Sequence, residues 1–202
     1  MLEKKPTSRQ LQADKTRETI YNIAVSLMEK QGFANTTIQE ISERAGVSIG
    51  TFYHYFRSKE DIFLDLFKKA DEYFETTVAP KLGQAAAAGT SSEELIVLYF
   101  RYYAKYNFKR GIGNISQLYN TKNKLFMKKG RYMQTLLREL IAKGQASLEL
   151  SPEMTPEEAT DHLFIASRGV IYDWCIHEAS YNLEQKMESY MRLQVKILKK
   201  SC

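Results

Sequence analysis

The residues best suited to specific chemistry lie between Thr37 and Lys59, in the segment TIQEISERAGVSIGTFYHYFRSK. Hydroxyl, phenol and imidazole groups can hydrogen-bond base edges and phosphates, and a glycine lets a backbone approach closely. Five such residues fall within seven positions of this segment: Ser48, Gly50, Thr51, Tyr53 and His54. These positions could meet a ligand if the elements that carry them turn them outward.

Two short helices joined by a tight turn must position these side chains. Thr37 and Ser48 are typical helix N-caps, and Gly46 permits a sharp turn between the helices. Apolar residues from both helices and the turn can share one core: Ile38, Ile41, Ala45, Val47, Phe52 and Phe56. A helix-turn-helix has this layout and reads the major groove with its second helix. Any two short helices with a glycine turn share the bare pattern, so the pattern alone leaves a purely structural role open.

The details of this segment resemble the signature of the TetR family of bacterial transcriptional regulators, over residues 15 to 66. In that family a Tyr-x-Tyr/His-Phe run is followed by Lys and an acidic residue. Here these are Tyr53, His54, Tyr55, Phe56, Lys59 and Glu60. The resemblance implies an all-α fold, with an N-terminal three-helix helix-turn-helix DNA-binding domain joined to a larger helical ligand-binding and dimerisation domain.

By the same resemblance the chain is expected to be a sequence-specific DNA-binding transcriptional regulator. Repression is the commonest habit of the family, so we expect a repressor that a hydrophobic small-molecule effector releases from a palindromic operator. Ile49 stands where many relatives have a polar residue, and a thymine methyl group is the physical substitute for the lost hydrogen bond. The DNA contacts carried over position by position are Thr37 and Lys59 at phosphates and Ser48, Gly50, Thr51, Tyr53 and His54 on the recognition helix.

Residues 1–60 are predicted to form the DNA-binding domain, helix 59–79 to link it, and residues 80–202 to form the effector-binding and dimerisation domain. Pro80 and the stretch 83–89 are expected to end the linking helix. In the second domain, Ser91 opens one helix and Thr155, Pro156 and Glu158 form a capping box that opens another.

The helix after Thr155 is apolar on two faces, and a last helix from about Leu183 carries one apolar stripe. A helix with two apolar faces must be covered on both sides. By the resemblance these two helices form a four-helix bundle in a homodimer, which also supplies the two recognition helices that a palindrome needs. The predicted interface residues are Leu163, Ala166, Val170, Met187, Tyr190, Met191, Gln194 and Ile197.

The predicted effector pocket is lined by aromatic and hydroxyl-bearing side chains that suit flat or long apolar molecules. Each of them could instead pack the core. The predicted lining is Tyr102, Tyr106, Phe108, Tyr119, Phe126, Met133, His162, Phe164 and Trp174, with Tyr103 and Tyr132 as further candidates.

The net charge of +5 is unevenly distributed, because residues 99–138 carry ten Lys and Arg and no Asp or Glu. This basic block has two explanations. It is either a solvated basic face, or part of it rings the pocket mouth and attracts an anionic amphiphile such as an acyl-coenzyme A or a fatty acid. A second basic segment, the N-terminal arm with Lys4, Lys5 and Arg9, either reaches DNA or is a frayed terminus.

Other functional classes find little support. The three histidines lack metal-binding spacing, Gly111-Ile-Gly113 is followed by Ser116 where a dinucleotide loop needs its third glycine, and Cys175 and Cys202 suggest free thiols. We therefore expect no enzyme activity, no metal and no cofactor. The absence of a signal peptide or a ~20-residue apolar run predicts a cytoplasmic protein that does not bind membranes. The alternative function is a helical bundle that binds anionic lipid or a protein partner without binding DNA.

Overall fold

The computed structural model of the chain describes residues 7–119 and 125–199, in which the regular elements are helices and the one β-bridge, between Leu150 and Lys199, is isolated. The all-α class predicted from the sequence is confirmed. The chain divides into two compact units, Met1–Phe67 and Lys68–Cys202. Lys4 and Lys5 of the N-terminal arm and Cys202 lie outside the described residues, as do two lysines of the basic block 99–138, Lys122 and Lys124.

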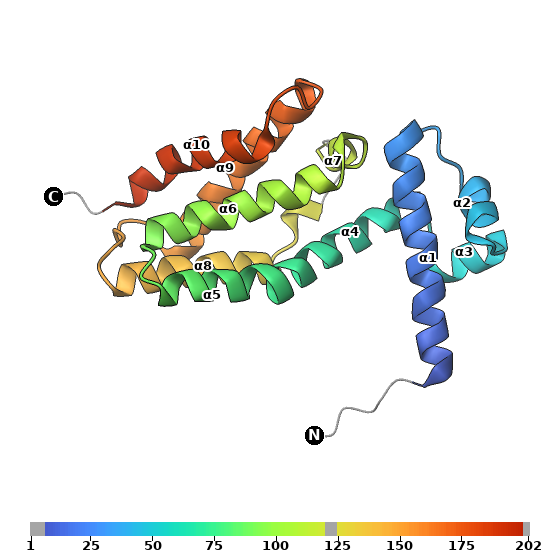
Figure 1. Cartoon of the computed structure of the whole chain (residues 1–202), viewed down its shortest axis with the longest axis horizontal. Helices are drawn as coiled ribbons and strands as arrows, with labels where there is room; N and C mark the ends of the chain where they lie inside the picture. The colour runs from blue at the N-terminus through green and yellow to red at the C-terminus, as the bar shows by residue number, and fades with distance from the viewer. Residues whose placement is uncertain (1–6, 120–124, 200–202) are drawn as a thin grey trace. The chain divides into compact units, whose positions relative to one another are not determined.

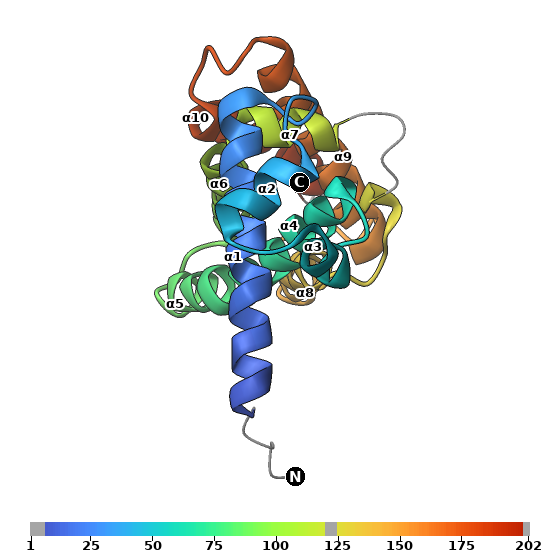
Figure 2. The ribbon, with the colours of Figure 1, turned by 90° about the vertical axis from the view of Figure 1, so that its right-hand side faces the viewer.

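Three helices and the start of a fourth build the first unit (Figure 2). One face of the first helix is apolar and buried, with Ile20, Ala24 and Met28 at 0% exposure. Phe52 and Phe56 return from the third helix to the same core, their ring centroids 5.8 Å apart. The bounds are α1 (Ser8–Gln31), α2 (Ile38–Ala45) and α3 (Ile49–Tyr55), with α4 (Lys59–Tyr73) beginning in this unit.

A partly buried ion pair links the two longest helices of the first unit. The guanidinium of Arg17 on α1 hydrogen-bonds the carboxylate of Asp65 on α4, which is only 3% exposed. Arg17 also lies 4.9 Å from the centroid of the Phe56 ring. Removing Arg17 would leave an uncompensated buried carboxylate, so this contact fixes α1, α4 and the end of α3 in one arrangement.

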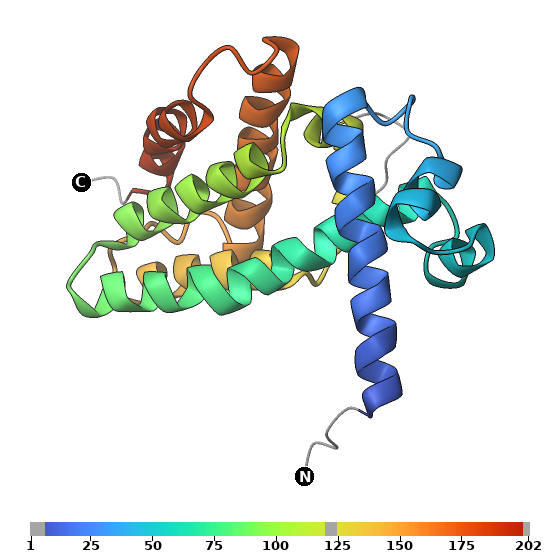
Figure 3. The same cartoon turned by 45° about the vertical axis from the view of Figure 1, so that its right-hand side comes forward.

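The helix that begins at Lys59 runs past its predicted end at residue 79 and past Pro80, and it ends at Ala87, inside the stretch 83–89 that the prediction also named. It continues as a π-helical turn, η1 (Phe74–Val78), and then as α5 (Ala79–Ala87) (Figure 3). A proline inside an α-helix loses one hydrogen bond and clashes with the carbonyl four residues back. Here the wider turn precedes Pro80, and the N–H of Ala79 donates to the carbonyl of Phe74 instead. The proline is thereby accommodated, and the helix stops only before Gly89, whose φ is +85°.

The second unit is a helical bundle in which α6 contacts α5, α8, α9 and α10 (Figure 1). The helix starts predicted at Ser91 and Thr155 are confirmed, since both side chains accept the backbone N–H three residues on. Its remaining elements are α6 (Ser92–Lys109), α7 (Ile112–Leu118), α8 (Tyr132–Ala146), α9 (Pro156–Ile176) and α10 (Leu183–Val195), with the 3-10 turns η2 (Leu125–Met127) and η3 (Lys196–Leu198).

An aromatic cluster forms the centre of this unit. Ring centroids of Tyr99 and Phe74 lie 4.8 Å apart, and those of Phe164 and Tyr103 lie 5.9 Å apart. The hydroxyl of Tyr99 donates to the carbonyl of Met133 at 2.7 Å, which ties α6 to the start of α8. Within residues 7–119 and 125–199, no helix is long and apolar enough to cross a membrane.

Candidate functional site

The helix-turn-helix of the first unit is built by local capping. The Thr37 hydroxyl accepts the N–H of Glu40 at 3.1 Å, and the Ser48 hydroxyl accepts the N–H of Thr51 at 3.0 Å. Gly46 adopts φ +66° and ψ 32°, the left-handed conformation that a sharp turn requires. Both helices of the motif therefore begin at hydroxyl caps, and the first of them ends at a glycine, as the sequence predicts.

Most of the predicted DNA-contacting residues are exposed on α3 and at the two caps. Tyr53 is 52% exposed, and the neighbouring Ile49 is 47% exposed. The Thr51 hydroxyl lies 2.9 Å from that of Ser48, so these two groups would offer themselves to a ligand as a pair. The exposed set comprises Thr37, Ser48, Gly50, Tyr53 and His54, while Thr51 is half-buried. An apolar and aromatic surface with hydroxyl groups at one end suits the floor of the major groove.

Lys59 occupies a different environment from the one expected of a phosphate contact. Its ammonium donates to the backbone carbonyls of Phe33 at 2.7 Å and Thr36 at 2.5 Å, and lies 4.4 Å from the centroid of the Phe33 ring. These contacts connect the start of α4 to the loop between α1 and α2. A phosphate contact by Lys59 stays a prediction, and the structure gives the residue a positioning role within the unit.

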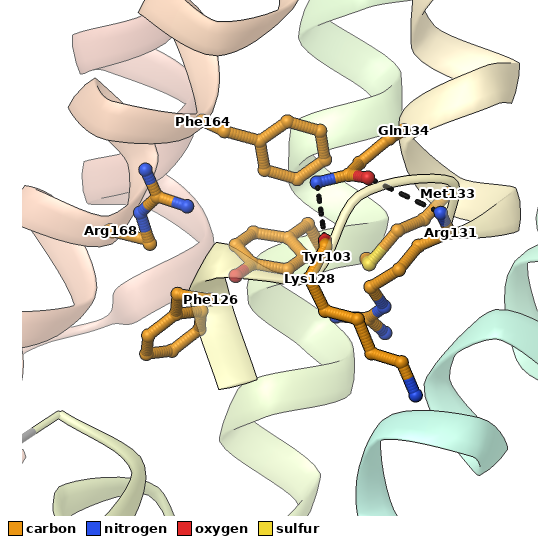
Figure 4. Close-up of a pocket in the computed structure, with 8 residues that line it drawn as sticks. All are labelled: Tyr103, Phe126, Lys128, Arg131, Met133, Gln134, Phe164 and Arg168. Carbon is orange, nitrogen blue, oxygen red and sulfur yellow. Dashed lines mark hydrogen bonds between the residues drawn. The ribbon is translucent and has the colours of Figure 1, made fainter. Parts of the chain in front are cut away.

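The second unit contains a small pocket between α6, α8, α9 and the segment preceding α8 (Figure 4). Its interior volume is about 20 Å³, room for roughly one water molecule. Its lining mixes aromatic and cationic side chains: Tyr103, Phe126, Lys128, Arg131, Met133, Gln134, Phe164 and Arg168. An apolar ligand larger than a water molecule could enter only if the lining side chains moved apart.

One wall of the pocket is organised by Asp71 of α4. Its carboxylate accepts from the Nε of Arg131 at 3.0 Å and from the backbone N–H of Met133 at 3.2 Å. Gln134 supports the same turn by accepting the Arg131 N–H at 3.3 Å (Figure 4). A single carboxylate therefore ties α4 to the first turn of α8, next to the pocket.

Tyrosine hydroxyls in this region remain uncharged. Burial raises the pKa of Tyr103 and raises the pKa values of Tyr99 and Tyr119 well above the ordinary value. Neutral hydroxyls can both donate and accept hydrogen bonds, so they can orient a polar ligand group without adding charge. The charge of the pocket is therefore set by its Lys and Arg side chains.

Only part of the predicted pocket lining reaches this cavity. Phe126, Met133 and Phe164 line it, as does the further candidate Tyr103. The others lie elsewhere: His162 is hydrogen-bonded to Gln194 at 3.0 Å, Phe108 is 53% exposed, and Tyr102, Tyr106, Tyr119 and Trp174 are not among the lining residues. Gln134 and Arg168 are lining residues that the sequence did not suggest, because neither stands out from an ordinary polar helix position.

Half of the residues predicted at the dimer interface are buried inside their own unit. Leu163, Met187 and Met191 are 0% exposed and Val170 is 5% exposed, so the stripe we expected to meet a partner packs the core instead. Ala166 and Gln194 are half-buried, whereas Tyr190 and Ile197 are exposed.

Exposed apolar residues of α9, α10 and η3 include two of the predicted interface residues, Tyr190 and Ile197, beside four that were not predicted. Exposed fractions are 63% for Ile165, 60% for Ile176 and 59% for Leu193. The members of this exposed face recur at helical spacing on two helices that contact each other: Ile165, Tyr172 and Ile176 on α9, and Tyr190, Leu193 and Ile197 on α10 and η3. The two apolar faces predicted on α9 do not include Ile165, Tyr172 and Ile176, and the second of them, with Phe164, Ile171 and Trp174, is buried. Among the described residues, no group of His, Cys, Asp or Glu could hold a metal ion.

Both units show similarity to known proteins. Residues 20–66 match the sequence profile described as bacterial regulatory proteins, tetR family. The fatty acid metabolism regulator protein of Bacillus subtilis is 22% identical over 181 residues, which cover 87% of this chain and 92% of that protein.

Solved structures of similar fold extend over most of the chain. FadR from Bacillus subtilis in complex with stearoyl-CoA has a TM-score of 0.69 and 21% identity, covering 88% of this chain and 97% of its own. Thermus thermophilus FadR in complex with lauroyl-CoA also has a TM-score of 0.69 and 21% identity, with coverages of 92% and 97%. These likenesses establish the fold of the second unit as well as the first.

Proposed function

Because this chain belongs to the TetR family and is a DNA-binding transcriptional regulator with an effector, we propose that it is a homodimeric repressor that an anionic amphiphile releases from a palindromic operator. One observation carries the DNA-binding half of the proposal. The exposed residues of α3 and its cap form one surface, and they lie within the segment 20–66 that matches the family. Tyr53, exposed and held next to the buried Phe52 at a centroid distance of 5.7 Å, is the anchor of that surface.

The dimer is supported by geometry and by the exposed face of α9 and α10. One recognition helix of seven residues offers few base contacts, and two such helices about 34–36 Å apart would read successive major grooves of a palindrome. The apolar face built around Ile165, Ile176 and Leu193 is exposed in the single chain. Apolar patches of this kind mark interaction sites. A second copy of the chain placed on this face would cover the same residues on both subunits.

The effector proposal rests on the charge and chemistry of the pocket. Lys128, Arg131 and Arg168 line it beside Phe126 and Phe164. Cations at an aromatic pocket favour a ligand with an apolar tail and an acidic head. Acyl-coenzyme A ligands in two neighbours of similar fold make a long-chain acyl-coenzyme A the first compound to test. This assigns part of the basic block to the ligand.

Selection from a random duplex DNA library with the full chain tests the DNA-binding proposal. We expect a two-fold symmetric consensus, which Tyr53→Ala should lose without a change in helical content, because Tyr53 projects outward. Leu11→Ala, at another exposed apolar position of the same unit, serves as the matched control. Retention by anionic vesicles with no selected duplex would contradict the proposal and favour the lipid-binding alternative.

Addition of amphiphiles to the complex with the selected duplex tests the effector proposal at fixed salt. Lauroyl-coenzyme A should dissociate the DNA, whereas dodecyltrimethylammonium at the same concentration should not. Release by the cation alone would contradict an anionic effector and leave the DNA-binding role in place.

A further inference from the structure

The ion pair between Arg131 and Asp71 lies where the effector pocket meets α4. The Arg131 side chain is 12% exposed and lines the pocket, while the Asp71 side chain is 26% exposed and touches the lining residues Arg131 and Met133 without lining the pocket itself. A guanidinium this deeply placed needs a carboxylate partner, because an unpaired charge in low-dielectric surroundings is costly. Asp71 supplies that partner from within the chain.

Asp71 also holds two helices together. Its second oxygen accepts the backbone N–H of Met133, the second residue of α8. The division between the two units falls inside α4, which carries Asp71 in its last turn. A change in the partner of Asp71 is therefore a change in how α4 is anchored to α8.

The pocket carries more positive charge than Asp71 balances. Three of its described lining residues are cationic, namely Lys128, Arg131 and Arg168, and no described lining residue is acidic. Arg168 lies 5.5 Å from the centroid of the Phe126 ring, so a cation and an aromatic surface are presented together on the side of α9. A second carboxylate or phosphate entering the pocket would be attracted by all three cations, while it would repel Asp71.

We propose, resting on the effector function proposed above, that Arg131 exchanges acidic partners. Asp71 holds Arg131 in the ligand-free chain, and the acidic head of an anionic amphiphile takes its place in the bound chain. Asp71 is thus an internal competitor that sets the affinity for anions, and its displacement loosens α4 from α8 as the pocket opens beyond its resting volume of about 20 Å³. Arg131 is the residue that selects an acidic head over a neutral or cationic one.

This exchange makes a prediction that a purely structural contact does not. If Asp71 competes with the ligand, Asp71→Asn should bind an anionic amphiphile more tightly, by roughly three- to tenfold. If Asp71 only supports the pocket wall, the same substitution should weaken binding. Glu157→Gln is the matched control. Glu157 lies on α9, and its carboxylate pairs at 3.4 Å with the guanidinium of Arg138, an exposed arginine of α8. The substitution thus also removes the acidic partner of an arginine, but at the surface.

The experiment is isothermal titration of the full chain with dodecanoate below its micelle concentration, repeated with lauroyl-coenzyme A, dodecanol and dodecyltrimethylammonium. We expect Asp71→Asn to bind both anions more tightly, Glu157→Gln to bind as the unchanged chain does, and Arg131→Gln to lose the preference for dodecanoate over dodecanol. Tightening for lauroyl-coenzyme A without tightening for dodecanoate would assign the exchanged group to the phosphates of the coenzyme. Unchanged or weaker anion binding by Asp71→Asn overturns the exchange. If that variant does not fold, the dodecanoate preference of Arg131→Gln decides, and its retention overturns the proposal.

The outcome is separable from that of the proposed function. A chain that selects a duplex but binds neither anion overturns the exchange and leaves the DNA-binding role intact. A chain that selects no duplex, yet binds anions more tightly after Asp71→Asn, supports the exchange and overturns the operator proposal.

Discussion

Lys59 offers the clearest test of whether a residue carried over from a family pattern contacts DNA or positions the elements that do. Its ammonium donates two hydrogen bonds to the loop between α1 and α2, to the carbonyls of Phe33 and Thr36. Lys59→Met keeps most of the apolar stem and removes both bonds and the contact with the Phe33 ring.

The expected cost can be worked out from these contacts. A hydrogen bond from a charged group contributes about 1.5–3 kcal/mol, and an exposed cation–π contact adds about 0.5–1 kcal/mol. Lys59 is half-buried, and water can replace part of what is lost. We therefore expect the local opening free energy of the loop and the start of α2 to fall by about 2 kcal/mol, which corresponds to roughly 30-fold faster amide exchange.

Hydrogen–deuterium exchange of the full chain, measured by mass spectrometry of peptides covering residues 32–41, reports this change. Lys30→Met, at an exposed position in the last turn of α1, is the control and should alter the local opening free energy by less than about 1 kcal/mol. Unchanged exchange in Lys59→Met, together with a salt dependence of DNA binding reduced by about one phosphate, would refute the positioning role and assign Lys59 to the DNA backbone.

Three further predictions concern the second unit. If the chain forms the proposed dimer, Leu193→Asp should convert it to monomers in light scattering, because the substitution places a charge on the exposed face of α9 and α10. Leu11→Asp should leave the mass unchanged, and a dimeric Leu193→Asp variant would contradict the proposed interface. Gly144→Ala should lower the melting temperature by several degrees, since a Cβ there would lie 2.7 Å from a methyl of Leu150 and such overpacking costs about 1–3 kcal/mol; an unaltered melting curve would show that the neighbours move freely. The N–H of Thr155 holds the pKa of Glu158 below its usual value. The cap therefore stabilises the start of α9 fully above the unfolded-state pKa of Glu158, and this stability is lost as the pH falls through the lowered folded-state pKa. The amide protection factors at the start of α9, which correct for the intrinsic exchange rate at each pH, should fall in that acid range, and Glu158→Gln should abolish this pH dependence.

Helix starts were the most predictable part of the fold. Thr37, Ser48, Ser91 and Thr155 each cap a helix at the position predicted from the sequence, because a cap depends on residues only three positions apart. The prediction that Pro80 ends a helix was wrong because a π-helical turn, which depends on the packing of Phe74 and Val78 in the core, absorbed the proline.

The faces of helices were harder to assign than their ends. Both apolar faces predicted on α9 meet the unit's own core, so Leu163 and Val170, predicted at the interface, are buried. The exposed apolar residues Ile165, Tyr172 and Ile176 lie on a further face that the prediction did not name. An aromatic-rich sequence likewise does not show which aromatic side chains line a pocket and which pack in the core. Phe164 serves both, while Trp174 is buried and donates to the carbonyl of Tyr181 at 3.1 Å.

The position of the boundary inside α4 has a consequence for anyone who would graft this DNA-binding head onto another sensor. A splice at the glycine-containing stretch 83–89 would carry the whole of α4 and part of the second unit's core with it, including Phe74 and Val78. A splice after residue 67 keeps the Arg17–Asp65 pair and the Lys59 contacts within the transplanted segment. Because each residue added to a helix turns the remainder of that helix by about 100°, such a chimera must keep the register of α4 to the residue, and a one-residue error would misdirect both heads of a dimer.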